Sequence, residues 1–177
     1  MQRRQFVRTG TVVLGAGGLS GCAGELQRFP TLKAAKSAVL ELGFGEVKLE
    51  HPSWNLSQLL QHLAQSIEFS MQGYPEMRGA VFRAVVGNTA FAVFNARGAM
   101  RHDLADPIPG APALKPQLLA KDGIARLLAA LNAFEAWGGS LRPHFAYGEL
   151  DKAQYTRAHL MHLANHWTQI RLAPLPR

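Results

Sequence analysis

The sequence has a single cysteine, Cys22, among its 177 residues. No disulfide can therefore form within the chain, even in an oxidising compartment. Acidic residues are also few, with 12 Asp and Glu against 19 Lys and Arg and a net charge of +7. No run of Lys and Arg accompanies this surplus, which argues against nucleic acid as a partner. The apolar run Thr11–Leu19 is too short and too rich in glycine to span a bilayer.

The first 22 residues contain the parts of an export signal in the expected order. Arg3 and Arg4 open the sequence RRQFV, which resembles a twin-arginine motif, and a short apolar run follows. The sequence LSGC, which ends at Cys22, resembles a bacterial lipobox. The alternative is a basic N-terminus with an incidental cysteine. The resemblance implies that residues 1–21 are a signal peptide, that Cys22 is lipidated, and that the precursor is exported already folded.

This signal changes the charge and the domain division that we expect. Arg3, Arg4 and Arg8 lie in the signal and no acid does, so the mature chain carries a net charge of about +4. Ala23 follows the lipidated cysteine where an inner-membrane retention signal would have Asp, which favours the outer membrane over the inner one. We expect a short linker at residues 22–30, one helical domain at residues 31–172 and a tail at residues 173–177.

Five stretches have the apolar spacing and end signals of helices and predict an all-α protein. Thr31 and Asp151 are predicted N-caps, and Gly43 is a predicted stop. The third stretch has Val81, Val85 and Phe91 among its apolar positions. We interpret the pattern as four main helices, one of them after a long crossover, bundled around a common core. The five stretches are residues 31–42, 54–72, 75–94 with a kink at 87–88, 117–137, and a last one that contains Tyr155–Ile170.

Two connections between these helices carry further predictions. A short extended piece is expected around residues 47–49. The stretch Arg97–Pro116 contains two glycines and four prolines and is predicted to be a loop, in which His102 lies. So long a loop is uncommon in a compact domain, and it is either a functional lid or a surface crossover.

Three histidines lie within eight residues of the last predicted helix, at His159, His162 and His166. At about 100° per residue, their imidazoles share an arc of roughly 60° on the helix. An i, i+4 pair of imidazoles supplies two converging ligands for a transition metal. The alternative is a half-buried polar stripe. His62, at the edge of the apolar face of the second helix, is either a third ligand or a hydrogen-bonded core histidine.

One His on the second helix and a His-x-x-x-His pair on the last, with Gln169 three residues further on, resemble the DinB-like superfamily, including its YfiT type of metal-dependent hydrolase. The sequence PHFAYG before the last helix resembles one branch of that superfamily, a domain of unknown function. The resemblance implies a DinB-like four-helix bundle with a long crossover loop and a three-histidine metal site at one end. It implies that the metal ligands are His62, His162 and His166, with His159 as an additional histidine near the site.

Three imidazoles would leave open positions on a divalent ion for water or a substrate. Such ligands suit Zn, Ni, Fe and Cu, so the identity of the metal stays open. No Glu adjoins the histidines as a general base. We expect the remaining polar residues near the site to orient ligands rather than to carry protons: His159, Gln169, Ser66 and Gln58.

Three functions remain open at this point. The protein is a lipid-anchored metal-dependent hydrolase or transferase acting on an unknown small molecule, a metal- or ligand-binding lipoprotein without turnover, or a structural helical bundle without metal. The sequence does not decide between a monomer and a homodimer.

Overall fold

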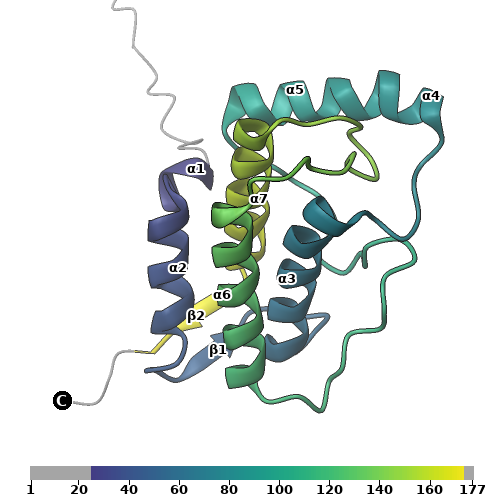
Figure 1. Cartoon of the computed structure of the whole chain (residues 1–177). Helices are drawn as coiled ribbons and strands as arrows, with labels where there is room; N and C mark the ends of the chain where they lie inside the picture. The colour runs from purple at the N-terminus through teal and green to yellow at the C-terminus, as the bar shows by residue number, and fades with distance from the viewer. Residues whose placement is uncertain (1–24, 174–177) are drawn as a thin grey trace, which may run out of the picture.

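The computed structural model describes residues 25–173. The described chain is mainly helical, with one short antiparallel pair of strands, which confirms the predicted class at the level of a mainly α fold (Figure 1). The predicted signal peptide, including Arg3, Arg4 and Cys22, lies outside the described residues. None of the described helices combines the length and apolarity needed to cross a bilayer.

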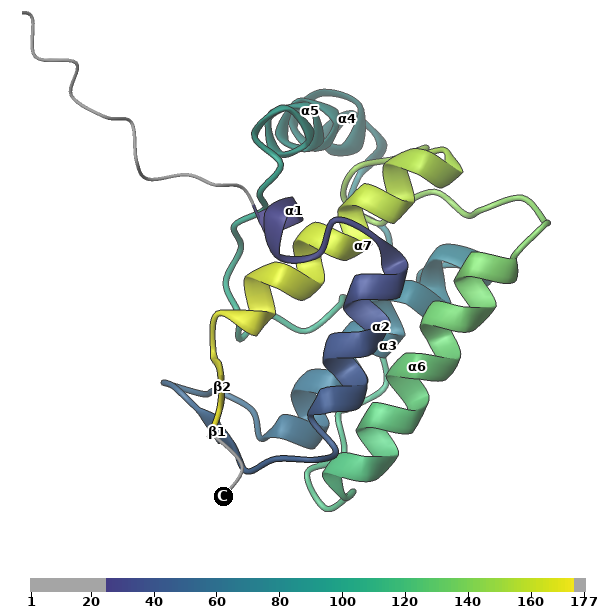
Figure 2. The ribbon, with the colours of Figure 1, turned by 90° about the vertical axis from the view of Figure 1, so that its left-hand side faces the viewer.

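The long helices are α2 (Leu32–Glu41), α3 (Leu56–Gln72), α6 (Ala120–Ala136) and α7 (Lys152–Trp167). They lie side by side in both views, with α3 packed along α6, and with α2 against α6 and α7 (Figures 1 and 2). A short helix, α1 (Glu25–Arg28), precedes α2 and packs on α7. The predicted positions of the four helices are correct to within a few residues.

The predicted helix starts rest on side-chain caps that the structure contains. The Oγ1 atom of Thr31 accepts a hydrogen bond from a backbone N–H in the first turn of α2. Asp151 and Gln154 form a reciprocal capping box at the start of α7, and Asn55 and Gln58 form another at the start of α3. Each box satisfies two N–H groups that a helix end would otherwise leave without partners.

The core lies between the long helices. Leu63 on α3 and Leu131 on α6 are fully buried, as their apolar spacing predicts. Gly123 allows α6 to approach α3 closely, because a Cβ atom there would lie 3.0 Å from Cβ of Leu60. Glycine lowers the helix propensity of α6 at this position, but it leaves the room that Leu60 of α3 needs.

The third predicted helix differs from expectation. The structure has α4 (Ala80–Phe82), a π-helical turn η1 (Arg83–Gly87) and α5 (Asn88–Arg97), which form one continuous rod rather than a kinked helix. This rod lies across one end of the long helices, as Figure 1 shows. Gly87 packs so tightly on the backbone of Ala146 that no side chain fits there, and the π turn accommodates this approach.

Because the rod contacts the rest of the molecule along one side only, its apolar residues are not all buried. Phe91 faces the core, whereas Val81 and Val85 are exposed, so the interpretation of the whole stretch as one core-facing helix is wrong. Pro75, expected as an early helical residue, lies before the rod.

Strands β1 (Val47–Leu49) and β2 (Ile170–Leu172) pair in antiparallel register, with Leu49 opposite Ile170. The extended piece at residues 47–49 was predicted, whereas β2 was not. Because β2 begins four residues after His166, this pairing ties the chain that follows α7 to the segment that leads into α3.

Residues 98–119 contain no helix or strand, as predicted for a long loop. Its second half is fastened to α3 by side-chain amides. The amide of Gln61 bonds both backbone groups of Lys115 at 2.9 and 3.0 Å, and Nε2 of Gln65 donates to the carbonyl oxygen of Pro112. The loop is therefore an ordered crossover that leads from α5 past α3 to α6.

Candidate metal centre

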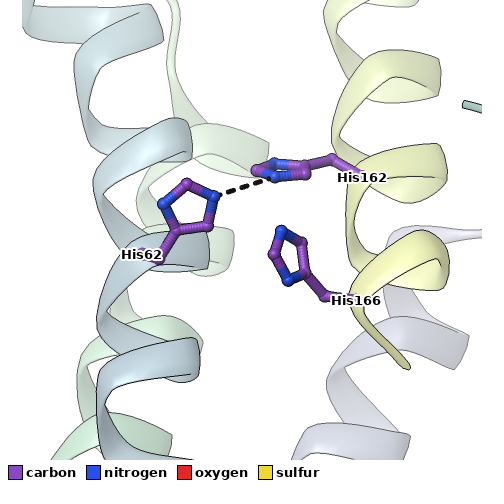
Figure 3. Close-up of side chains that lie close together, drawn as sticks. All are labelled: His62, His162 and His166. Atoms are coloured by element: carbon purple, nitrogen blue, oxygen red, sulfur yellow. Dashed lines mark hydrogen bonds between the residues drawn. The ribbon is translucent and has the colours of Figure 1, made fainter. Parts of the chain in front are cut away.

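Helices α3 and α7 bring three imidazoles together in the middle of the molecule. His62 projects from α3, and His162 and His166 project from α7 one turn apart, so that all three rings face one point (Figure 3). One ligand nitrogen from each ring lies within 4.8 Å of the others. The three side chains therefore lie close enough to hold one metal ion. We call them the histidine cluster.

The spacing of the rings is nearly equal. The ring centroids of His62 and His162 are 5.0 Å apart, and that of His166 lies 4.9 Å from each. The Nε2 atoms of His62 and His162 approach to 3.2 Å. The helix geometry explains this arrangement, because residues four apart on α7 share a face and that face packs on α3.

Several nitrogens of the histidine cluster lack protein partners. Within residues 25–173, Nδ1 of His62 and both ring nitrogens of His166 are buried and make no hydrogen bond. A buried polar atom without a partner costs about 1–3 kcal/mol. A metal ion would take one of the two nitrogens of His166, beside Nε2 of His62, so the residues present fit a bound cation.

Burial also keeps the cluster in the form that binds metals. Burial, with a smaller contribution from nearby imidazoles, lowers the pKa of His62 to about 3 and that of His166 to about 2. The pKa of His162 lies well below its usual value, again mainly because of burial. The three rings are therefore neutral at pH 7, and neutral imidazoles are the species that coordinate metals.

Two residues beside the cluster had no assigned role in the sequence analysis. The ring of Trp54 lies 4.8 Å from that of His62 and is nearly parallel to that of His166 at 6.2 Å. The ring of His102, from the long crossover loop, lies 5.0 Å from that of His162 and 5.1 Å from that of His166. The available signal for His102 was its place in a long irregular loop, where functional residues are common.

Ser66 and Gln169 were predicted to support the metal ligands. The Oγ atom of Ser66 lies 3.1 Å from Nδ1 of His162, where it can orient that ring. Gln169 lies just beyond α7, and its Nε2 atom donates to the carbonyl oxygen of His51 at 3.5 Å. Ser66 therefore contacts one imidazole of the cluster directly, and Gln169 acts on another, since its side chain partly offsets the lowering of the pKa of His166 by burial.

His159 and Gln58, the other two predicted supporting residues, have hydrogen-bond partners outside the cluster. His159 is buried one turn before the cluster, with Nε2 3.2 Å from Oγ of Ser70 and its ring edge-on to Phe134 at 4.8 Å. Gln58 is used in the capping box of α3 and does not contact the cluster. The shared helix face placed His159 near the cluster, but its neighbours are core residues.

His144, in the aromatic loop before α7, has a structural role. Its Nδ1 atom accepts hydrogen bonds from the backbone N–H groups of Ala146 and Tyr147, and its ring stacks on Tyr147 at 4.2 Å. Burial lowers the pKa of His144 to about 3, with His159 adding to the effect. This neutral imidazole fixes the loop that carries Phe145 and Tyr147.

A cavity of about 300 Å³ adjoins the histidine cluster. Five histidines contribute to its lining, namely His62, His102, His144, His159 and His162. Ser66 and residues of the crossover loop and of the loop before α7 line much of the rest. Of the residues that line this cavity, Arg78 and Asp106 are the charged ones. A small molecule in the cavity would therefore contact the imidazoles directly.

Comparison with known proteins gives a family without an assigned activity. No curated protein and no solved structure matches the chain. One family model, described as a protein of unknown function (DUF1569), matches residues 24–173. This range includes all four long helices, the histidine cluster and the crossover loop. The chain therefore belongs to the DUF1569 family of proteins of unknown function.

Proposed function

We propose that this protein binds a divalent transition-metal ion through His62, His162 and His166, and that it acts on a small molecule in the adjoining cavity as a metal-dependent hydrolase or transferase. The observation that carries the proposal is the convergence of three neutral imidazoles from two helices within 4.8 Å. Hydrolysis or group transfer fits this ligand set because three protein ligands leave coordination positions for water and substrate.

A divalent ion held there supplies Lewis-acid chemistry, since it makes water more acidic and polarises a carbonyl or phosphoryl group. The protein's own residues would do the rest. Ser66 holds the ring of His162 through Nδ1, and Trp54 shields His62 and His166. Phe145 and Tyr147 form an apolar wall that would limit water around a bound substrate.

The arrangement of the long helices supports a relationship to the DinB-like four-helix bundle. In that interpretation, α2, α3, α6 and α7 are the bundle, and residues 98–119 are its crossover. The ligands come from α3 and α7, the second and last helices of this bundle, as the resemblance implies.

Metal binding without turnover is the second candidate. It is favoured by the charged lining of the cavity, where Asp106 carries the single carboxylate and is exposed to solvent. A hydrolase needs a group that takes a proton from water within hydrogen-bond reach, and the cavity offers one carboxylate for that role.

For its location, we propose export by the twin-arginine route and attachment to the outer membrane through a lipid on Cys22. That route suits a protein that binds its metal before export. A substrate would then be a small molecule of the cell envelope or its surroundings.

The test is metal analysis of protein purified without a histidine tag. We expect about one equivalent of a divalent transition metal, which a chelator removes and which returns on addition of Zn²⁺ or Ni²⁺. A hydrolase or transferase would show metal-dependent turnover in a screen of esters, amides and phosphate esters. Protein that neither retains nor takes up metal would refute both candidate functions.

A further inference from the structure

We infer that His102 is a fourth ligand of the metal, carried to the histidine cluster by the crossover loop. This inference rests on the proposed metal site and deepens it. The ring of His102 lies 5.0 and 5.1 Å from those of His162 and His166, and the three cluster rings are separated by 4.9–5.0 Å. His102 is therefore spaced from its neighbours as they are from one another.

The hydrogen bonding of His102 fixes its tautomer. Its Nδ1 atom lies 2.8 Å from the carbonyl oxygen of Asp103. A carbonyl oxygen can only accept, so Nδ1 carries the proton and donates it. In the neutral ring, Nε2 then has a free lone pair, as a metal ligand requires.

The environment of Nε2 supports the same role. Within the described part of the chain, Nε2 of His102 is buried and has no hydrogen-bond partner. A buried acceptor without a partner is costly, as it is for the nitrogens of His62 and His166. The ring lines the cavity together with His62 and His162, and its centroid lies within 5.1 Å of those of His162 and His166.

His102 differs from the other ligands in what holds it. The histidine cluster is built on two long helices, whereas His102 lies in the first half of the crossover loop. That loop is fastened to α3 further along, at Pro112 and Lys115. His102 can therefore leave the metal without unfolding a helix. We assign it the role of an exchangeable ligand, which gives up its position to an oxygen atom of a substrate in the cavity.

X-ray absorption of the Zn²⁺-loaded full-length protein tests this inference by counting imidazole ligands. We expect four imidazoles in the wild type and three in His102→Ala, with metal still bound. His51→Ala is the matched control, because His51 is an exposed loop histidine outside the cluster. Its ligand count should equal that of the wild type.

The outcomes separate this inference from the proposed function. A wild type that binds no metal refutes the metal site itself. A wild type that binds Zn²⁺ through three imidazoles, with no change in His102→Ala, refutes the role of His102 and leaves the three-histidine site intact. Optical spectra of the Co²⁺-loaded proteins provide a second readout, because loss of a ligand changes the coordination geometry and hence the visible absorption.

A second, independent observation concerns the outer side of the α4–η1–α5 rod. Val81 and Val85 are 79% and 61% exposed. Further large apolar residues on the rod are also exposed, namely Phe82, Val86 and Val93. Single exposed apolar residues are ordinary, but a row of them on one helix marks an interaction surface. We call these five residues the apolar face of the rod.

We propose that the apolar face lies in the interfacial region of an anionic lipid bilayer. The rod itself carries two arginines, Arg83 and Arg97, and no Asp or Glu, whereas the segments that flank it contain both Arg78 and Arg101 and the acids Glu76 and Asp103. A helix with an apolar face and a purely basic charge is typical of binding to anionic membranes. The described chain also begins beside this rod, since the N–H of Leu26 donates to the carbonyl oxygen of Gly98 at 2.9 Å. Cys22, the proposed lipid attachment point, is four residues before Leu26.

Spin labels on the full chain test this contact directly. In a Cys22→Ala background, Val85→Cys labels the apolar face, and Lys121→Cys labels an exposed position on α6 as the control. With vesicles that contain phosphatidylglycerol, the label at position 85 should become accessible to oxygen and shielded from a nickel chelate. The label at position 121 should not change.

Three results would overturn the membrane proposal. The first is a label at position 85 that stays as accessible to the nickel chelate as the control. The second is shielding that appears without vesicles and grows with protein concentration, which would show that a second copy covers the face. The third is equal insertion into phosphatidylcholine vesicles, which would remove the role of the arginines.

Discussion

Replacing His166 with leucine should stabilise the metal-free protein while abolishing metal binding. His166 is fully buried, and neither of its ring nitrogens has a hydrogen-bond partner among the described residues. Removing a buried polar group that has no partner recovers a desolvation cost of about 1–3 kcal/mol. Leucine is similar in volume and leaves little cavity. We expect the free energy of unfolding in EDTA to rise by about 1–3 kcal/mol.

His144→Leu is the matched control, because the imidazole of His144 is also buried but has hydrogen-bond partners in the protein. Its Nδ1 atom accepts from two backbone N–H groups, which the substitution would leave unpaired. We expect a loss of about 1–3 kcal/mol. Urea unfolding in EDTA measures both effects. If His166→Leu is destabilised as much as His144→Leu, the nitrogens of His166 are not unsatisfied in the metal-free fold and the argument for a metal-binding cluster loses its energetic basis.

The remaining predictions concern the metal, the core, pH and export. Replacing any of the three clustered histidines with alanine should remove most bound metal, with helical content retained. His159→Ala should weaken metal affinity less, by at most the roughly 10–100-fold typical of a supporting residue. Equal losses of metal in all four variants would contradict this order. Leu63→Ala and Leu131→Ala should each cost about 2–5 kcal/mol and Lys121→Ala within about 0.5 kcal/mol, and equal melting temperatures would show that the helix faces are misassigned. Folding lowers the pKa of the buried imidazoles, so below about pH 6.5 the unfolded chain takes up protons that the folded chain does not. The free energy of unfolding of the metal-free protein should therefore be full above that pH and fall toward pH 3, by up to about 1.4 kcal/mol per pH unit for each imidazole. Urea midpoints independent of pH would refute it. Cys22→Ala should leave an unprocessed precursor without lipid, and normal lipid labelling would refute lipidation.

The helices that carry the cluster were predictable because their signals are local. Asp151 with Gln154, and Asn55 with Gln58, cap α7 and α3 within four residues of chain. The i, i+4 spacing of His162 and His166 then places two imidazoles on one face, whatever that face contacts. That His62 meets them from α3 came from the family resemblance, since helix periodicity does not fix how two helices are aligned.

The rod was mispredicted because apolar spacing does not say how much of a helix the rest of the molecule covers. The residues from Ala80 to Phe94 are apolar enough for a core helix, yet the rod crosses the end of the long helices and is covered on one side. Its π turn contains Gly87, which lies too close to the backbone of Ala146 for any side chain to fit. Neither fact is present in the local sequence.

The same reasoning explains why the sequence pointed to His159 as a residue near the metal and did not point to His102. A helix face about 60° wide includes His159, but one turn along α7 is enough to separate it from the three clustered rings, and it lies between Ser70, Phe134 and the adjoining cavity. His102 lies outside any helix, so helix spacing says nothing about its neighbours. It belongs to a loop that is bound to α3 through the side chain of Gln65. Spacing along the chain identifies ligands that share a helix. A ligand on a crossover loop is found only when the tertiary contacts that place the loop are known. For this reason His102 is assigned to the metal from its tautomer and its burial, and not from its position in the sequence.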